Sequence, residues 1–265
     1  MRDSADVLTD PPPPAADAQI AYGPEPLQFG DLRVPPGDGP FPLALVLHGG
    51  YWQAMYNLIH TGHLCEALRD AGIASWNLEY RCLGVPGGEW PAAAEDLDRA
   101  LAHRDDLPFA HDGRTVLVGH SAGGQLALWA AKRSGLPVVA LAPVSDVRDA
   151  VERRGPESAP GRFMAPEHFA DGSPLELLPL GVPPDRDPRR RRTTSVPYEM
   201  SRRYVAARGT EAEARHARSA RATSSRSTRK RRSSRRRSPR SSDSSSRTRS
   251  RCGSRPGPPS ARSRG

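Results

Sequence analysis

A serine at position 121 stands in a pattern that suits nucleophilic catalysis. Residues 117–131 read LVGHSAGGQLALWAA, so 119–123 follow the pattern G-x-S-x-G. A serine hydroxyl becomes a useful nucleophile only when a base takes its proton, and in this pattern the serine lies on a sharp turn from a strand to a helix. The alternative is a serine that only caps a helix. The strand-like residues before Ser121 and the helical pattern after it favour the nucleophile.

A second segment offers amide groups for the same chemistry. Residues 48–52 read HGGYW and follow the apolar run 42–48. Small residues after such a strand let backbone N–H groups point at the oxygen that becomes negative during acyl transfer. We expect the amides near Gly50 and Tyr51, together with the N–H of Ala122, to form this oxyanion hole. The alternative for a Gly-Gly pair is an ordinary loop.

The elements that must position these groups alternate along the chain. Strands are expected at 27–34, as an edge strand, and at 42–48, 73–81, 114–120 and 137–146. Helices are expected at 58–72, 90–104 and 122–133. This alternation predicts an α/β sandwich with mostly parallel strands and a ligand site at their carboxyl ends. Residues 147–180 are expected to form a small cap over that edge.

Four motifs, HGGYW, WNLEYR, GGEWP and VGHSAGGQLALWAA, occur in this order. Together they resemble the α/β-hydrolase superfamily, and within it bacterial esterases similar to kynurenine formamidase and feruloyl esterases, over residues 20–183. The resemblance implies an α/β-hydrolase sandwich with helices on both faces. It also implies a serine hydrolase that cleaves small carboxylic esters or arylformamides through an acyl-enzyme, without a metal or an organic cofactor. The residues matching the nucleophile and the oxyanion segment are Ser121 and Gly49, Gly50, Tyr51 and Ala122.

Two catalytic groups of that family find no match. The family expects a strand ending in HGT-x-D-x-x-VP, whose Asp is the triad acid, and a later G-x-x-H turn whose His is the base; this chain has neither. Residues 195–206, SVPYEMSRRYVA, resemble the family again, whereas 184–194 have a suitable length and the wrong chemistry. We interpret 184–194 and the residues from 207 onward as translated out of frame, so that the last strands of the sheet are missing or garbled.

Other residues are poor substitutes for the missing pair. Asp146 ends the strand 137–146 and is a candidate acid, although capping a helix over 147–153 is the favoured role. The histidines stand in the two motifs, on outer helices, at the opposite edge of the sheet, in the cap and in the tail: His48, His120, His60, His63, His103, His111, His168 and His216. The base is therefore unassigned, and the chain as written is expected to be almost inactive.

Charge divides the chain into two parts. Residues 1–183 carry 13 Lys and Arg against 24 Asp and Glu, a net charge of −11, whereas 184–265 carry 26 against 6, a net charge of +20. We expect a Pro-rich leader at 1–19, a hydrolase core at 20–183, a degraded continuation at 184–206 and a disordered basic tail at 207–265. If the tail is genuine, the alternative is a pseudoenzyme whose Arg/Ser arm binds nucleic acid electrostatically.

The remaining features exclude several classes of protein. Cys65, Cys82 and Cys252 are odd in number and widely spaced, so neither a disulfide framework nor a zinc site is expected. The first 19 residues lack the apolar run of a signal peptide, and no segment is long enough to span a bilayer. We therefore expect a cytoplasmic protein that has a small ester or amide as substrate and no membrane partner.

Overall fold

The computed structural model describes residues 9–180, 184–185 and 197–207. Contacts between Cα atoms divide the chain into one unit at Met1–Arg218 and a second at Ser219–Gly265. The second unit lies outside the described residues. The predicted disordered tail from 208 onward and most of the segment predicted to be out of frame, 186–194, also lie outside them.

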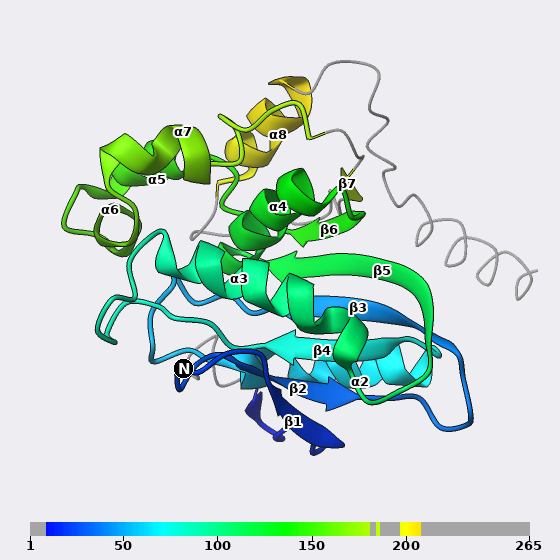
Figure 1. Cartoon of the computed structure of the whole chain (residues 1–265). Coiled ribbons are helices and arrows are strands. Elements are labelled where there is room, and N and C mark those ends of the chain that lie inside the picture. The colour runs from blue at the N-terminus through cyan, green and yellow to red at the C-terminus, as the bar shows by residue number, and fades with distance from the viewer. Residues whose placement is uncertain (1–8, 181–183, 186–196, 208–265) are drawn as a thin grey trace, which may run out of the picture. The chain divides into compact units, whose positions relative to one another are not determined.

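The described residues form a seven-stranded sheet of order β1-β2-β4-β3-β5-β6-β7 (Figure 1). Its strands are β1 (Ala18–Ala21), β2 (Phe29–Arg33), β3 (Phe41–Leu47), β4 (Ala74–Leu78), β5 (His111–His120), β6 (Val138–Leu141) and β7 (Pro184–Asp185). The pairs β1–β2 and β2–β4 are antiparallel, and the pairs from β4 to β7 are parallel. The prediction of a mostly parallel sheet is confirmed.

Helices cover both faces of this sheet. Leu43, Leu45 and Leu47 of β3 pack into the larger core cluster, which also contains residues of α3 (Ala92–His103) and α4 (Ala122–Ser134). Ala44 and Val46 point to the other face, where they pack near α2 (Gly62–Asp70). Figure 1 shows α3 and α4 in front of the sheet and α2 behind it. The short helices η1 (Leu58–Thr61) and η2 (Arg104–Asp106) adjoin α2 and α3.

The expected cap follows β6. It comprises α5 (Val147–Arg154), α6 (Ala159–Phe163), η3 (Pro166–His168) and α7 (Phe169–Gly172), which lie on the side of the sheet toward which β5 points (Figure 1). The chain then contributes one more helix, α8 (Tyr198–Ala207). Met200 and Tyr204 of α8 are buried in the larger core cluster. Helix α8 therefore supplies side chains to the core.

The prediction of an edge strand at 27–34 is wrong. This strand is β2, and β1 covers its outer side in the register Ala18↔Leu32. The error arose because β1 begins inside the Pro-rich segment that was assigned to a leader. That segment also packs on the fold, since the Arg33 guanidinium donates to the carbonyl of Pro14 at 2.7 Å. A Cβ added to Gly62 would lie only 2.5 Å from a ring carbon of Pro13.

A second difference concerns the end of the sheet. No regular strand was expected at 184–194, yet Pro184 and Asp185 pair with Val138 and Val139 of β6. Backbone groups can pair without an apolar side-chain pattern, which explains why composition did not reveal this short strand. Proline is tolerated there because it is the first residue of the strand.

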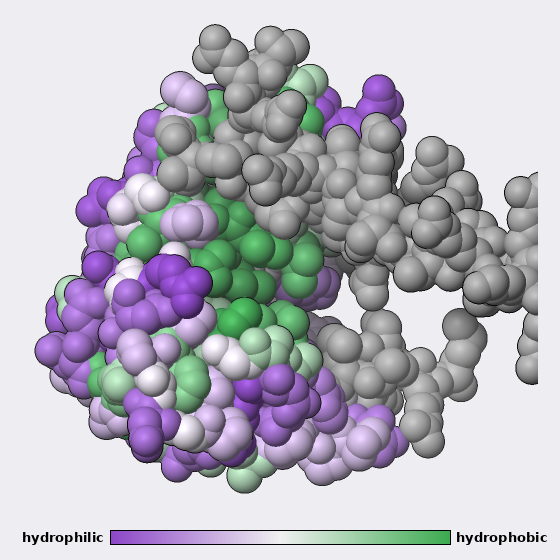
Figure 2. All heavy atoms as spheres, turned by 90° about the vertical axis from the view of Figure 1, so that its right-hand side faces the viewer, coloured by the Kyte–Doolittle hydropathy of each residue, from purple (hydrophilic) through white to green (hydrophobic). Residues whose placement is uncertain are grey.

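Some apolar residues reach the surface. Figure 2, which views the right-hand side of Figure 1, shows a patch of apolar residues with hydrophilic residues to its left and below it. The smaller core cluster is bordered by partly buried apolar residues, namely Leu64, Leu68, Ile73, Val116 and Val139. No helix among the described residues is long and apolar enough to cross a membrane.

Candidate active site

Ser121 occupies a strained turn between β5 and α4. Its φ is 55° and its ψ is −114°. Such a conformation is unfavourable for a residue with a side chain and persists only where the surroundings fix it. Here the N–H of Ser121 donates to the carbonyl of Leu141 at 2.9 Å, and its own carbonyl accepts from Gly124 and Val144. The predicted strand-turn-helix context of Ser121 is confirmed.

The two glycines of the motif are required by close backbone approach. A Cβ on Gly119 would lie 2.2 Å from the carbonyl oxygen of Gly123. A Cβ on Gly123 would lie 2.2 Å from the carbonyl oxygen of His48 and 2.3 Å from that of Leu47. Both distances are far shorter than a non-bonded contact allows. The first turn of α4 is thereby pressed against the carboxyl end of β3.

The segment 48–52 meets Ser121 at this point. A Cβ on Gly49 would lie 3.1 Å from Cβ of Ser121, so these two predicted site residues are neighbours. Gly50 has a φ of 114°, and Tyr51 and Trp52 both have a φ of 53°. Three successive residues therefore hold a conformation that favours glycine. Ala122, the remaining predicted oxyanion residue, is buried and begins α4 directly after Ser121.

Tyr51 turns its side chain toward the cap. Its hydroxyl accepts a hydrogen bond from the guanidinium of Arg154 at 2.6 Å. The guanidinium carbon lies 4.8 Å from the centre of the Tyr51 ring. Because Arg154 is the last residue of α5, this stacking contact joins the segment 48–52 to the cap.

Trp52 is buried on the other side of the same segment. Its ring stacks on Phe163 of α6 with centroids 4.5 Å apart and an angle of 5° between the planes. Its indole N–H donates to Oε1 of Gln125 at 3.0 Å, and the Gln125 amide donates to the carbonyl of Gly172 at 2.8 Å. Trp90 packs edge-on against Phe163. Both tryptophans, only 1% and 5% exposed, therefore belong to the core.

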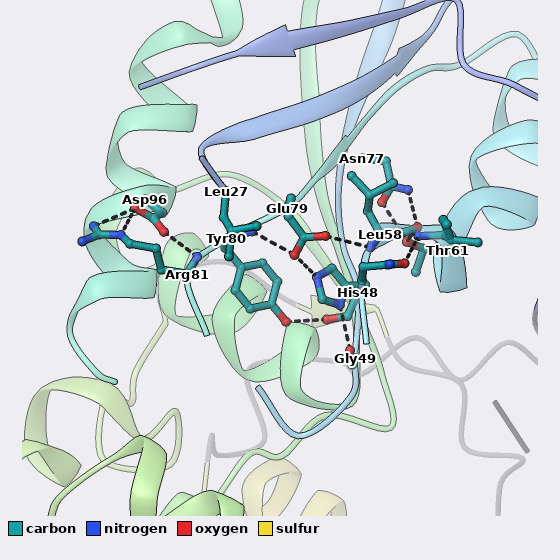
Figure 3. A network of polar contacts seen from close by, with 12 residues as sticks. Leu27, His48, Gly49, Leu58, Thr61, Asn77, Glu79, Tyr80, Arg81 and Asp96 are labelled. Carbon is teal, nitrogen blue, oxygen red and sulfur yellow. Dashed lines mark hydrogen bonds and ion pairs between the residues drawn. The ribbon is translucent and has the colours of Figure 1, made fainter. Parts of the chain in front are cut away.

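A buried polar pair, His48 and Glu79, contacts the segment 48–52 at Gly49 (Figure 3). Nε2 of His48 lies 2.8 Å from Oε1 of Glu79, and Nδ1 lies 2.7 Å from the carbonyl oxygen of Gly49. Glu79 also accepts from the backbone N–H of Leu58 at 3.1 Å and of Tyr80 at 3.3 Å. The Tyr80 ring stacks on His48 with centroids 4.5 Å apart, and its hydroxyl donates to the His48 carbonyl at 2.9 Å. Burial, together with the charge of Glu79, raises the pKa of Tyr80 well above its usual value.

Glu79 was not among the predicted site residues. Strands β3 and β4 are parallel with Leu47 opposite Leu78, so His48 and Glu79 each come one residue after a paired position. Residues that directly follow neighbouring parallel strands emerge at the same edge of the sheet. The strands were predicted at 42–48 and 73–81, so both residues were counted inside strands, and their common edge follows only from the register of β3 and β4.

Asp146 has the structural role that the sequence favoured. Its Oδ1 accepts from the backbone N–H of Asp149 at 2.9 Å and so caps α5. Its Oδ2 forms an ion pair of 3.2 Å with Arg203 of α8. The carboxylate of Asp146 is therefore engaged on both oxygens, and its role as a triad acid stays a prediction.

The described histidines lie where the sequence placed them. Besides His48, six histidines are described, namely His60 in η1, His63 in α2, His103 in α3, His111 at the start of β5, His120 at its end and His168 in η3. Burial, and then the neighbouring His48, lowers the pKa of His60. His216 lies outside the described residues. The base that Ser121 needs is not identified by this placement.

The described part of the chain contains no cluster of side chains that could bind a metal ion. There, no group of three or more His, Cys, Asp or Glu side chains is arranged to hold a metal ion. Cys65 and Cys82 are buried free thiols.

A serine on a strand-turn-helix elbow, with a glycine segment beside it at the carboxyl edge of a parallel sheet, is typical of α/β hydrolases. Residues 44–243 match the model of the alpha/beta hydrolase family, and the chain belongs to this family of hydrolases. No curated protein matches the chain.

Solved structures share the fold at low sequence identity. A protein from Silicibacter sp. TM1040, provisionally assigned as a thioesterase, has a TM-score of 0.58 and 23% identity over 77% of this chain and 78% of its own. An acetyl ester-xyloside bifunctional hydrolase from Caldicellulosiruptor lactoaceticus has a TM-score of 0.56 and 19% identity over 73% and 81%. Esterase B from Lactobacillus rhamnosis has a TM-score of 0.61 and 16% identity over 76% and 75%.

Proposed function

We propose that this hydrolase cleaves a small carboxylic ester or an arylformamide through an acyl-enzyme on Ser121. The observation that carries the proposal is the strained turn at Ser121 with Gly49 beside it. The Ser121 oxygen attacks the substrate carbonyl carbon while its proton passes to a base. The alcohol or amine then leaves with a proton, and water hydrolyses the acyl-serine. The amides of the segment 49–51 and of Ala122 stabilise the oxyanion in both steps.

The substrate class is supported by two kinds of likeness. The four sequence motifs resemble kynurenine formamidase and feruloyl esterases. Proteins of the same fold are named as an acetyl ester-xyloside bifunctional hydrolase and as esterase B. Trp52 and Trp90 are buried in the core, so their role is packing.

The acid and the base are proposed to be encoded in another reading frame of the codons for 184–194 and for the residues after 207. Helix α8 supports this interpretation. Met200 and Tyr204 of α8 are buried in the hydrolase core, although the expected motifs of the acid and the base are absent from the sequence on both sides. A segment that packs correctly between two segments of foreign composition is what two compensating frameshifts would produce.

The first test combines a probe for serine nucleophiles with sequencing. The gene is resequenced across codons 180–265, and the resulting chain and its Ser121→Ala variant are treated with a fluorophosphonate probe, 4-nitrophenyl acetate and formanilide. We expect a corrected frame that encodes Gly-Thr-x-Asp before SVPYEMS and Gly-x-x-His after it, with labelling and turnover that vanish in Ser121→Ala. If the reported frame holds and no labelling occurs, the proposal fails. Salt-sensitive binding to random duplex DNA would then support the pseudoenzyme with a basic arm.

A further inference from the structure

The buried pair of His48 and Glu79 constrains where protons lie. The carbonyl oxygen of Gly49 can only accept a hydrogen bond, so Nδ1 of His48, 2.7 Å away, must carry a proton. A carboxylate oxygen likewise only accepts, so the contact of 2.8 Å between Nε2 and Oε1 of Glu79 needs a second proton. A neutral imidazole beside an ionised Glu79 would leave one of these short contacts between two lone pairs.

The surroundings of Glu79 decide which partner holds the second proton. Both carboxylate oxygens accept from backbone N–H groups, Oε2 from Leu58 and Oε1 from Tyr80. Hydrogen bonds of this kind favour the ionised carboxylate. The Tyr80 ring, stacked on the imidazole at 4.5 Å, favours a cation at that place. The second proton therefore belongs on Nε2, which makes His48 an imidazolium.

The proton on Nδ1 has a geometric consequence for the oxyanion segment. A trans peptide group is planar, and its carbonyl and its N–H point in opposite directions. Fixing the carbonyl of Gly49 toward His48 therefore fixes the N–H of Gly50 away from it. Gly49 itself adjoins Ser121. The backbone of His48 is held as well, because its carbonyl accepts a hydrogen bond from the Tyr80 hydroxyl.

We propose that His48 and Glu79 form an imidazolium–carboxylate positioning pair that aims the Gly50 N–H at the oxyanion. This inference rests on the proposed function, because the oxyanion forms only when Ser121 attacks a substrate carbonyl. Glu79 never touches the substrate; it keeps both protons on His48. In Glu79→Gln the neutral amide gives the imidazole no counter-charge, so the ring carries one proton. The charge-assisted contact that fixes the ring is then lost, and the carbonyl of Gly49 is held less firmly.

The protonation state is tested by NMR on the intact chain labelled with nitrogen-15. His48 is assigned by the loss of its signals in His48→Asn. We expect N–H correlations from both ring nitrogens of His48 in the wild type and from only one in Glu79→Gln. A single protonated ring nitrogen in the wild type would overturn the proposal. This measurement does not depend on whether Ser121 reacts, so it is separate from the test of the proposed function.

The positioning role is tested by the Gly50 amide and by kinetics. The matched control is Tyr22→Phe, which removes a hydroxyl that donates to the backbone carbonyl of Glu79 at 2.6 Å but leaves its carboxylate in place. We expect the Gly50 amide resonance to move in Glu79→Gln and not in Tyr22→Phe. In the active enzyme, kcat should fall about 10²- to 10³-fold in Glu79→Gln with KM nearly unchanged, and stay constant in Tyr22→Phe. A Gly50 amide that is equally placed in both variants contradicts the proposal.

Discussion

The indole N–H of Trp52 donates to Oε1 of Gln125 at 3.0 Å, although 73 positions separate the two residues in the chain. The same Gln125 side chain donates to the carbonyl of Gly172 in the cap. Gln125 is fully buried in α4, one turn after Ser121. A single amide group therefore joins the segment 48–52, helix α4 and the cap.

Replacing this amide should weaken the contacts among the segment 48–52, helix α4 and the cap. Gln125→Met keeps an unbranched side chain but leaves the Trp52 N–H and the Gly172 carbonyl buried without a partner. Each unpaired group costs about 1–3 kcal/mol, so we expect a matching loss in the free energy of unfolding, measured with denaturant. The control Gln19→Met, at an exposed hydrogen bond, should change it by less than about 0.5 kcal/mol. Equal losses in both variants would contradict this role of Gln125.

Gly123 is expected to tolerate no side chain. In Gly123→Ala the new methyl group would meet the carbonyl oxygens of His48 and Leu47 at 2.2 and 2.3 Å. Backbone atoms cannot move aside as a flexible side chain can, so we expect a loss of about 3 kcal/mol or more, seen as a large fall in Tm. Ser134→Ala, at the other end of α4, serves as control. An unchanged Tm in Gly123→Ala would contradict the close approach of Gly123 to the carbonyl oxygens of His48 and Leu47.

Asp146 can be assigned by comparing two substitutions. Asparagine caps helices as well as aspartate does, whereas alanine does not. If Asp146 only caps α5, Asp146→Asn should keep the rate of Ser121 labelling, and Asp146→Ala should lower stability by about 1 kcal/mol. A fall of about 10⁴-fold in the labelling rate of Asp146→Asn, with stability retained, would instead make Asp146 the triad acid.

Two buried thiols predict a loss of stability in alkali. Burial raises the pKa of Cys65 to about 11 and that of Cys82 to about 12, from a usual value of 9.0. Their stabilising effect is complete below pH 9 and declines as pH rises toward 11 and 12, because the unfolded chain loses the thiol protons first. At pH 10 each thiol should cost about 1 kcal/mol relative to pH 8.

The measurement is denaturant unfolding of a Cys252→Ser variant at both pH values. The further replacement of Cys65 and Cys82 by alanine removes their contribution and leaves that of the other titrating groups. The pH dependence should therefore be smaller in the triple variant. The same dependence in both variants would show that the two thiols ionise as readily in the folded protein as in the unfolded chain.

The central part of the fold was predictable because its signals are local. The apolar run at 42–48 and the glycines around Ser121 each specify one strand or turn, and the structure has them at those places. Strand β1 was missed because four residues after a proline cluster carry little pattern of their own; pairing with β2 makes them a strand. Glu79 was missed because its importance comes from register with β3, a relation between strands that no single segment contains.

The strand order gives the site a kinetic property. Glu79, Gly49 and Ser121 directly follow or lie just beyond β4, β3 and β5, three adjacent strands in the centre of the sheet. Closing the loops between them costs chain entropy that is recovered only when all three strands are paired. During refolding, the reactivity of Ser121 toward a probe should thus appear at the same rate as the central sheet forms, so this rate measures the assembly of the sheet.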